Sequence, residues 1–152
     1  MEVKTLNQLD LSKNPVIAQM SMNNHEQILF CNDNATGLKA IIAIHNTVLG
    51  PSLGGTRMWN YNNEMEALHD LLRLSRGMTY KSSVAGLNLG GGKAVIIGDA
   101  KKIKNEALLR RFGKFVDSLG GKYSTAEDVA MTSRDIEIIK METDHVSGLP
   151  EN

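Results

Sequence analysis

The sequence has little cysteine, no excess of charge of either sign and no long apolar run. Cys31 is the single cysteine among 152 residues, so an intrachain disulfide is excluded, which suits a reducing compartment. Lysine plus arginine and aspartate plus glutamate both number 17, so no surplus of positive charge favours nucleic acid or anionic lipid. No stretch approaches the roughly 20 apolar residues that span a bilayer, and the start lacks the apolar core of a signal peptide. These absences predict a cytoplasmic protein that binds neither nucleic acid nor membrane.

Metal ligands are also sparse. The histidines at positions 25, 45, 69 and 145 are scattered without ligand spacing, and one cysteine offers no recognisable zinc site. We therefore expect no bound metal. The length and the 41% apolar composition suit one domain with a genuine core.

The first part of the chain changes in texture at residue 26. Residues 1–25 are polar and predict an amino-terminal arm, with at most a brief helix around Leu6 and Leu9. Residues 27–31 and 38–45 are apolar, β-branched runs on either side of a turn-like DNATG segment, which predicts a β-hairpin. The following LGPSLGGTRMW segment is expected to be a loop leading into a short strand.

Helices and strands alternate in the second part. We expect helices over 63–82 and 105–119, a buried strand over 93–98, a strand over 122–128, a short helix after a capping box of Thr132 and Asp135, and a further strand over 143–148. This order predicts a three-layer α/β domain with a mixed sheet, spanning residues 26–148. Residues 149–152 are expected to begin an interdomain linker.

Three consecutive glycines precede Lys93 in the GLNLGGGK segment, residues 86–93. Phosphate-binding loops follow a strand and open a helix, whereas here a helix precedes and a strand follows, so Gly90–Gly92 match a nucleotide site poorly. A tight turn is an alternative, but it does not explain a lysine at the entrance of an apolar strand. A lysine held near apolar surface and a second cation, such as Lys81, is suited to act as a base.

Each of these residues also has an ordinary structural interpretation. Lys81 suits a solvated charge at a helix end, and Asp128 suits an acid that starts a helix or a turn. Trp59 and Tyr61 fit either an interface or packing at a strand end. Chemistry and spacing leave these alternatives open.

Five separated strings carry a more specific signal: GLKAIIAIH, LGPSLGGTRMW, LRLSRGMTYKSSVAGLNLGGGKAVIIGD, YSTAEDVAMT and ETDHVSG. In this order and spacing they resemble the glutamate/leucine/phenylalanine/valine dehydrogenase family, over nearly everything from Glu26 to Gly148. The resemblance implies the family's amino-terminal domain, which supplies the amino acid site and the subunit contacts. A homo-oligomer is therefore expected.

The resemblance also implies roles for single residues. Lys81 matches the lysine that holds the substrate carboxylate, Lys93 the general base, and Asp128 the acid that assists proton transfer. Gly54 and Gly55 match glycines that let main chain approach the substrate. The implied reaction is reversible oxidative deamination of an L-amino acid to a 2-oxo acid and ammonium.

Substrate preference is implied by two further positions. Leu53 stands where glutamate-specific members carry a lysine for the side-chain carboxylate, and Ala126 matches a small residue that lines the side-chain pocket. A second carboxylate would lack its cation there, so leucine, valine or isoleucine is the expected substrate, without preference among them.

The cofactor implied by the resemblance is NAD. No GxGxxG follows a strand in these residues, so the dinucleotide-binding (Rossmann) domain is absent from them and they are expected to be inactive alone. The alternative is a non-catalytic module that binds amino acids or serves only for assembly.

Overall fold

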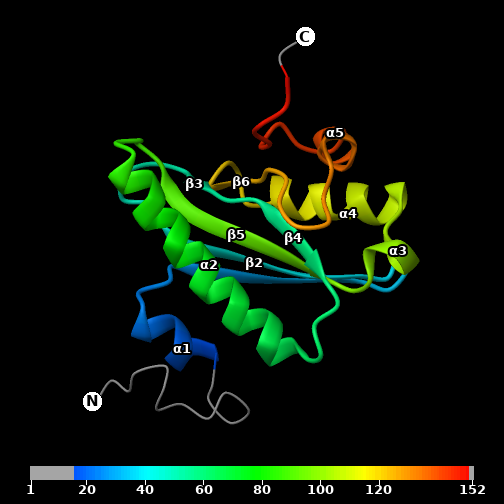
Figure 1. Ribbon diagram of the computed structural model, residues 1–152, viewed down its shortest axis with the longest axis horizontal. Coiled ribbons are helices and arrows are strands. Elements are labelled where there is room, and N and C mark those ends of the chain that lie inside the picture. Colours follow the sequence, from blue (N-terminus) through cyan, green and yellow to red (C-terminus); the bar gives the residue numbers. More distant parts are fainter. Residues whose placement is uncertain (1–15, 151–152) are drawn as a thin grey trace.

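The computed structural model describes residues 16–150, which form an α/β domain with helices on both faces of a six-stranded sheet (Figure 1). The predicted brief helix around Leu6 and Leu9 lies outside the described residues. The helices are α1 (Val16–Met22), α2 (Glu64–Val84), α3 (Ala100–Ile103), α4 (Glu106–Asp117) and α5 (Ser133–Lys140). The strands are β1 (Gln27–Asp33), β2 (Leu38–Asn46), β3 (Ser52–Leu53), β4 (Thr56–Trp59), β5 (Gly90–Ile97) and β6 (Tyr123–Ser124).

The sheet has the order β1-β2-β5-β3-β6, and β4 pairs with the later part of β5. The β1–β2 and β2–β5 pairs are antiparallel, whereas β3 and β4 run parallel to β5. The expected mixed sheet is therefore confirmed, as is the predicted hairpin, in which Asp33 lies opposite Leu38. The short strands β3 and β4 both pair with the long strand β5. The segment that joins β3 to β4, Gly54–Gly55, therefore lies beside the middle of β5.

Two apolar clusters hold the three layers together. On one face of the sheet, residues of α4 and α5 such as Phe112 and Ile139 pack against β2 and β5. On the other face, Leu68, Leu71 and Leu72 of α2 pack against the alternate residues of the same strands, Val95 among them. Because both faces of β2 and β5 are covered, these strands are apolar on both sides. No helix within residues 16–150 is long and apolar enough to cross a membrane.

The helix boundaries follow local side-chain chemistry. Asn63 and Asn105 cap α2 and α4 by accepting hydrogen bonds from the backbone amides of Glu66 and Leu108. Thr132 and Asp135 form the predicted capping box of α5. After α4, Gly120 and Gly121 have φ angles of 62° and 93°, as expected for the end of a helix.

Gly90–Gly92 do not form the loop that the sequence suggested. They are the first three residues of β5, and all three are buried. A β-carbon on Gly91 would come within 2.2 Å of the amide nitrogen of Thr79 in α2, and one on Gly92 within 2.7 Å of the Tyr123 ring. The glycines are therefore needed for close packing on both faces of the sheet, and neither a tight turn nor a phosphate loop is their reason. Lys93 consequently lies inside the strand and not at its entrance.

Three other expectations were wrong in detail. The segment after Gly50 contains two short strands, β3 and β4, because Gly54 and Gly55 interrupt the pairing. The strand expected over 122–128 has only two residues, and the one expected over 143–148 reduces to a single bridge between Thr125 and Val146. The short helix α3, capped by Asp99, was not predicted, since four residues are too few for a periodic pattern.

Candidate functional site

Lys93 points from β5 to the face of the sheet that α2 covers. Gly91 and Val95, two residues away on either side, both contact α2 or its apolar cluster, and side chains of a strand alternate between the faces. The Lys93 side chain is 8% exposed, and its Nζ lies 3.1 Å from Oδ2 of Asp128. A buried ammonium with this carboxylate as its ion-pair partner is the centre of the candidate site.

Asp128 belongs to the loop after β6, and this loop is tied to β4. The amide of Thr56 donates to the carbonyl of Ala126 at 2.8 Å, and the amide of Met58 donates to the carbonyl of Val129 at 3.0 Å. The loop therefore continues the sheet at its edge and brings the half-buried Asp128 carboxylate over the α2 face.

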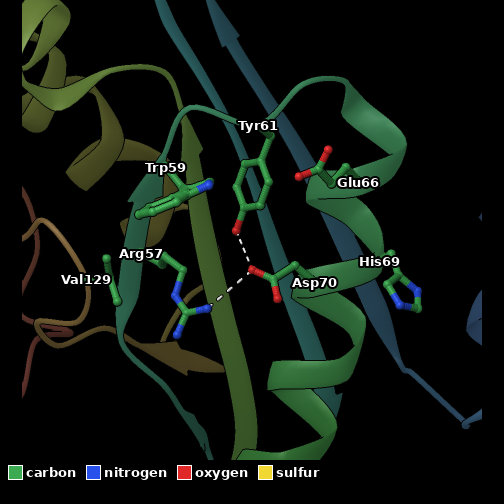
Figure 2. Close-up of a pocket in the computed structure, with 7 residues that line it drawn as sticks. All are labelled: Arg57, Trp59, Tyr61, Glu66, His69, Asp70 and Val129. Atoms are coloured by element: carbon green, nitrogen blue, oxygen red, sulfur yellow. Dashed lines mark hydrogen bonds and ion pairs between the residues drawn. The ribbon is translucent and has the colours of Figure 1, made fainter.

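Arg57 and Asp70 extend the ion pair into a network (Figure 2). Arg57 Nε donates to Oδ2 of Asp128 at 3.0 Å, and Arg57 Nη1 lies 3.4 Å from Oδ2 of Asp70 on α2. The hydroxyl of Tyr61 donates to the same Asp70 oxygen. These residues lie beside an open pocket of about 480 Å³, lined by Arg57, Trp59, Tyr61, Glu66, His69, Asp70 and Val129.

The network keeps both carboxylates ionised. Burial acts to raise the pKa of Asp128, but the hydrogen bonds and positive charges of Lys93 and Arg57 outweigh it, so the pKa lies below its ordinary value. Asp70 behaves in the same way, with Tyr61, Arg73 and Arg57 overcoming the effect of burial on its pKa. Burial, followed by the Asp70 carboxylate, raises the pKa of the Tyr61 hydroxyl, which therefore remains a hydrogen-bond donor.

The glycines predicted to approach a substrate lie next to this pair. A β-carbon on Gly54 would come within 1.6 Å of the carbonyl oxygen of Gly92, and one on Gly55 within 3.0 Å of Cβ of Asp128. Leu53 lies opposite Gly91 in the parallel register, so it shares the α2 face. Ala126 is half-buried on the loop that carries Asp128. The structure thus places Leu53, Gly54 and Gly55 beside the start of β5, and Ala126 on the loop that carries the ion-pair partner of Lys93.

Lys81 is the predicted site residue that the structure does not join to the others. It is exposed in the last turn of α2, and within residues 16–150 its ammonium makes no hydrogen bond or ion pair. Gly77 lies seven residues after Asp70 and Lys81 lies eleven after it. These separations correspond to about two and three helical turns, so the three residues share one face of α2. Lys81 therefore lies on the same side of α2 as the network, further towards the end of the helix.

Sequence reasoning missed Arg57 and Asp70 entirely and left Tyr61 between two interpretations. A usable signal was present, since Arg57, Trp59 and Tyr61 alternate directly after the glycine pair, which predicts a shared face. The partner Asp70 lies on a different element, and only the packing of α2 against the sheet brings it to Arg57.

Comparisons with known proteins give the family of the chain. A family model described as Glu/Leu/Phe/Val dehydrogenase, dimerisation domain, matches residues 25–145. The chain is 64% identical over 130 residues to leucine dehydrogenase from Geobacillus stearothermophilus, covering 86% of this chain and 35% of that protein. It is 57% identical over 129 residues to valine dehydrogenase from Streptomyces virginiae, covering 84% of this chain and 36% of that one.

A solved structure is similar as well. The crystal structure of L-tryptophan dehydrogenase from Nostoc punctiforme matches with a TM-score of 0.85 and 49% identity, over 88% of this chain and 40% of that chain. The chain spans about a third of the length of the curated relatives it matches.

Proposed function

The chain belongs to the Glu/Leu/Phe/Val dehydrogenase family, and we propose that it supplies the amino acid site and the subunit contacts of an NAD-dependent dehydrogenase for branched-chain L-amino acids. The reaction is reversible oxidative deamination of leucine, valine or isoleucine to a 2-oxo acid and ammonium. The observation that carries the proposal is the buried Lys93 ammonium in contact with Asp128, beside Leu53 of β3 and the Gly54–Gly55 segment that follows it.

In this proposal, Lys93 is the base. An amino acid presents an ammonium group that must lose a proton, and water that attacks the resulting imine must lose one too. Nζ of Lys93 takes these protons, and the ionised Asp128 carboxylate, with Oδ2 3.1 Å from Nζ, assists the transfer by pairing with the ammonium that forms. Burial of Lys93 excludes bulk water from this exchange.

Lys81 binds the substrate carboxylate. The ammonium of Lys81, which has no partner within residues 16–150, lies on the helix face that also carries Asp70. A carboxylate is an anion that a lysine pairs with in a charge-assisted hydrogen bond. Lys81 belongs to α2 and Lys93 to β5. An amino acid bound between them would therefore have its carboxylate next to α2 and its amine next to β5.

The aliphatic preference rests on Leu53 and Ala126. Both are half-buried, and neither offers a charge to a second carboxylate. An apolar side chain gains by burial there, at about 25 cal/mol per Å² of apolar surface, whereas a carboxylate loses its hydration without compensation.

The glycine run that precedes Lys93 does not fit a phosphate of the NAD cofactor. The glycines Gly90–Gly92 lie in a paired strand, and Thr79 and Tyr123 occupy the space against two of them, so no cradle for a phosphate exists there. We therefore place the NAD site outside residues 16–150, and take residues 26–148 as the substrate and assembly domain, with an arm before it and an interdomain linker from residue 149. The description of the matched family as a dimerisation domain supports a second copy of the chain as partner.

The proposal is tested by replacing Lys93 with alanine in the complete dehydrogenase. We expect kcat for leucine to fall by at least about 100-fold, the usual contribution of a general base. The matched control is Lys104→Ala, which removes a comparable ion pair, 2.7 Å from Asp135, on the face of the sheet that α4 and α5 cover. A Lys93→Ala enzyme with near-normal kcat would refute the assigned base.

A further inference from the structure

We propose that Arg57 is a positioning residue for the Lys93–Asp128 pair, and that Asp70 and Tyr61 hold its guanidinium in place. The catalytic consequence of this inference rests on the proposed function, whereas the structural part does not. Arg57 was not singled out by the sequence motifs, and its role follows from its contacts.

The first observation is that one oxygen of the Asp128 carboxylate contacts two cationic side chains. Oδ2 of Asp128 lies 3.0 Å from Nε of Arg57 and 3.1 Å from Nζ of Lys93. Arg57 and Lys93 are side chains of neighbouring parallel strands, β4 and β5, whereas Asp128 belongs to a loop. The two strand residues therefore determine where the loop carboxylate lies.

The second observation is that Arg57 is itself fixed from α2. Its Nη1 lies 3.4 Å from Oδ2 of Asp70, and this oxygen also accepts the Tyr61 hydroxyl. Arg73 pairs with the other oxygen, Oδ1, at 2.8 Å, but its side chain is 61% exposed, and Asp70 is its one ion-pair partner among the residues that the structure describes. An unbroken series of contacts thus runs from Tyr61 through Asp70, Arg57 and Asp128 to Lys93.

The second cation, Arg57, stabilises the Asp128 carboxylate when Lys93 acts as a base. If Lys93 alone neutralised Asp128, loss of its proton would leave a half-buried carboxylate without a cation, which is costly. Arg57 cannot lose its proton in the working pH range, so it continues to pair with Asp128 when Lys93 becomes neutral. Lys93 can then exchange a proton while the carboxylate keeps its charge and its place.

The groups that act on Asp128 come from four elements. Lys93 on β5 and Arg57 on β4 favour its ionised form, Tyr123 on β6 lies close enough to be affected by its charge, and Asp70 on α2 acts through Arg57. Removing the Arg57 charge therefore leaves Lys93 as the one remaining cation on this carboxylate among the described residues.

The test combines a carboxyl titration with kinetics. In the 152-residue chain, we expect Arg57→Met to raise the pKa of Asp128, followed by ¹³C NMR, by about 1, as for the loss of a neighbouring opposite charge. Arg57→Lys retains the charge but cannot reach both Asp128 and Asp70, so a smaller rise is expected. The matched control Arg73→Met removes an arginine from the same Asp70 and should leave the titration unchanged.

In the complete dehydrogenase, the acidic limb of the pH profile of kcat/KM for leucine should move upward in the same order. An unchanged Asp128 titration in Arg57→Met overturns the inference. If that variant does not fold, Arg57→Lys decides, and wild-type behaviour in both measurements would refute the inference. A wild-type enzyme that does not oxidise leucine refutes the proposed function instead, and the titration still tests Arg57.

Discussion

Acidification is expected to destabilise the chain in part through the buried histidine His25. Its ring is 7% exposed, and Nε2 contacts the carbonyl oxygen of Leu72 at 2.9 Å and the Ser75 hydroxyl at 3.2 Å. Since a carbonyl can only accept, Nε2 carries the proton and Nδ1 is the unprotonated nitrogen, which is buried and has no hydrogen-bond partner within residues 16–150. Protonation would place a charged donor there with no acceptor.

The pKa of His25 is correspondingly lowered from 6.5 to about 4. Burial is the largest cause, and the nearby His45 and Arg76 lower it further, against the Leu72 hydrogen bond, which raises it. The unfolded chain therefore binds a proton at higher pH than the folded chain does. This stability is fully present above about pH 6.5 and is lost as the pH falls towards 4. At about 1.4 kcal/mol per pH unit, the loss is about 2 kcal/mol at pH 5 and about 3 kcal/mol at pH 4.

The measurement is urea unfolding of the 152-residue chain between pH 7 and pH 4. His25→Gln cannot titrate and retains a donor for the Leu72 carbonyl, so its stability should fall by about 3 kcal/mol less than that of the wild type over this range. Because carboxylates such as Asp128 and Asp135 are present in both proteins, their acid titration cancels in the comparison. Equal losses in wild type and His25→Gln would refute the burial argument.

Three further outcomes are expected. Lys81→Ala in the complete dehydrogenase should raise KM for leucine by about 10- to 100-fold, the value of a hydrogen bond to a charged group, and unchanged steady-state kinetics would remove Lys81 from the site. Leu53→Lys should increase kcat/KM for glutamate relative to leucine, because it supplies a cation for the second carboxylate; a ratio that stays constant in competition assays would show that Leu53 does not face the substrate side chain. Gly54→Ala should lower the free energy of unfolding in urea by roughly 3 kcal/mol or more, because its β-carbon would meet the Gly92 carbonyl at 1.6 Å. Gly77→Ala, at a site in α2 with open space around it, is the control and should raise the free energy of unfolding by about 0.5–1 kcal/mol. Equal effects of the two substitutions would contradict the close approach of the Gly54 segment to β5.

The local elements were predictable wherever a single segment carries its own signal. The hairpin of β1 and β2 shows two apolar, β-branched runs around a turn, α2 and α4 have one apolar stripe each, and the cap of α5 depends on residues three positions apart. Segments whose order depends on distant partners were predicted poorly. The strand β6 and the bridge at Val146 are short because β3 and Thr125 offer only a few residues to pair with.

The glycines Gly90–Gly92 also could not be interpreted from their own segment, because their role depends on residues far away in the sequence. Three glycines in a row predict a loop from the sequence alone, since glycine weakens a strand. Their neighbours Thr79 and Tyr123 lie 12 or more residues away along the chain, so the space that excludes a side chain at Gly91 and Gly92 exists only after folding.

The sequence by itself determined the fold class from its order of helices and strands. The resemblance of five separated strings to a known family then gave the family and the candidate site residues Lys93, Asp128, Lys81 and Leu53. The tertiary structure decided which of them meet. It joined Lys93 to Asp128, left the Lys81 ammonium free of protein partners within the described residues, and added Arg57, Asp70 and Tyr61 to the site. The physical reason is that an ion pair depends on distances between side chains of separate elements, and these are fixed only when α2 and the loop after β6 pack against the same face of the sheet.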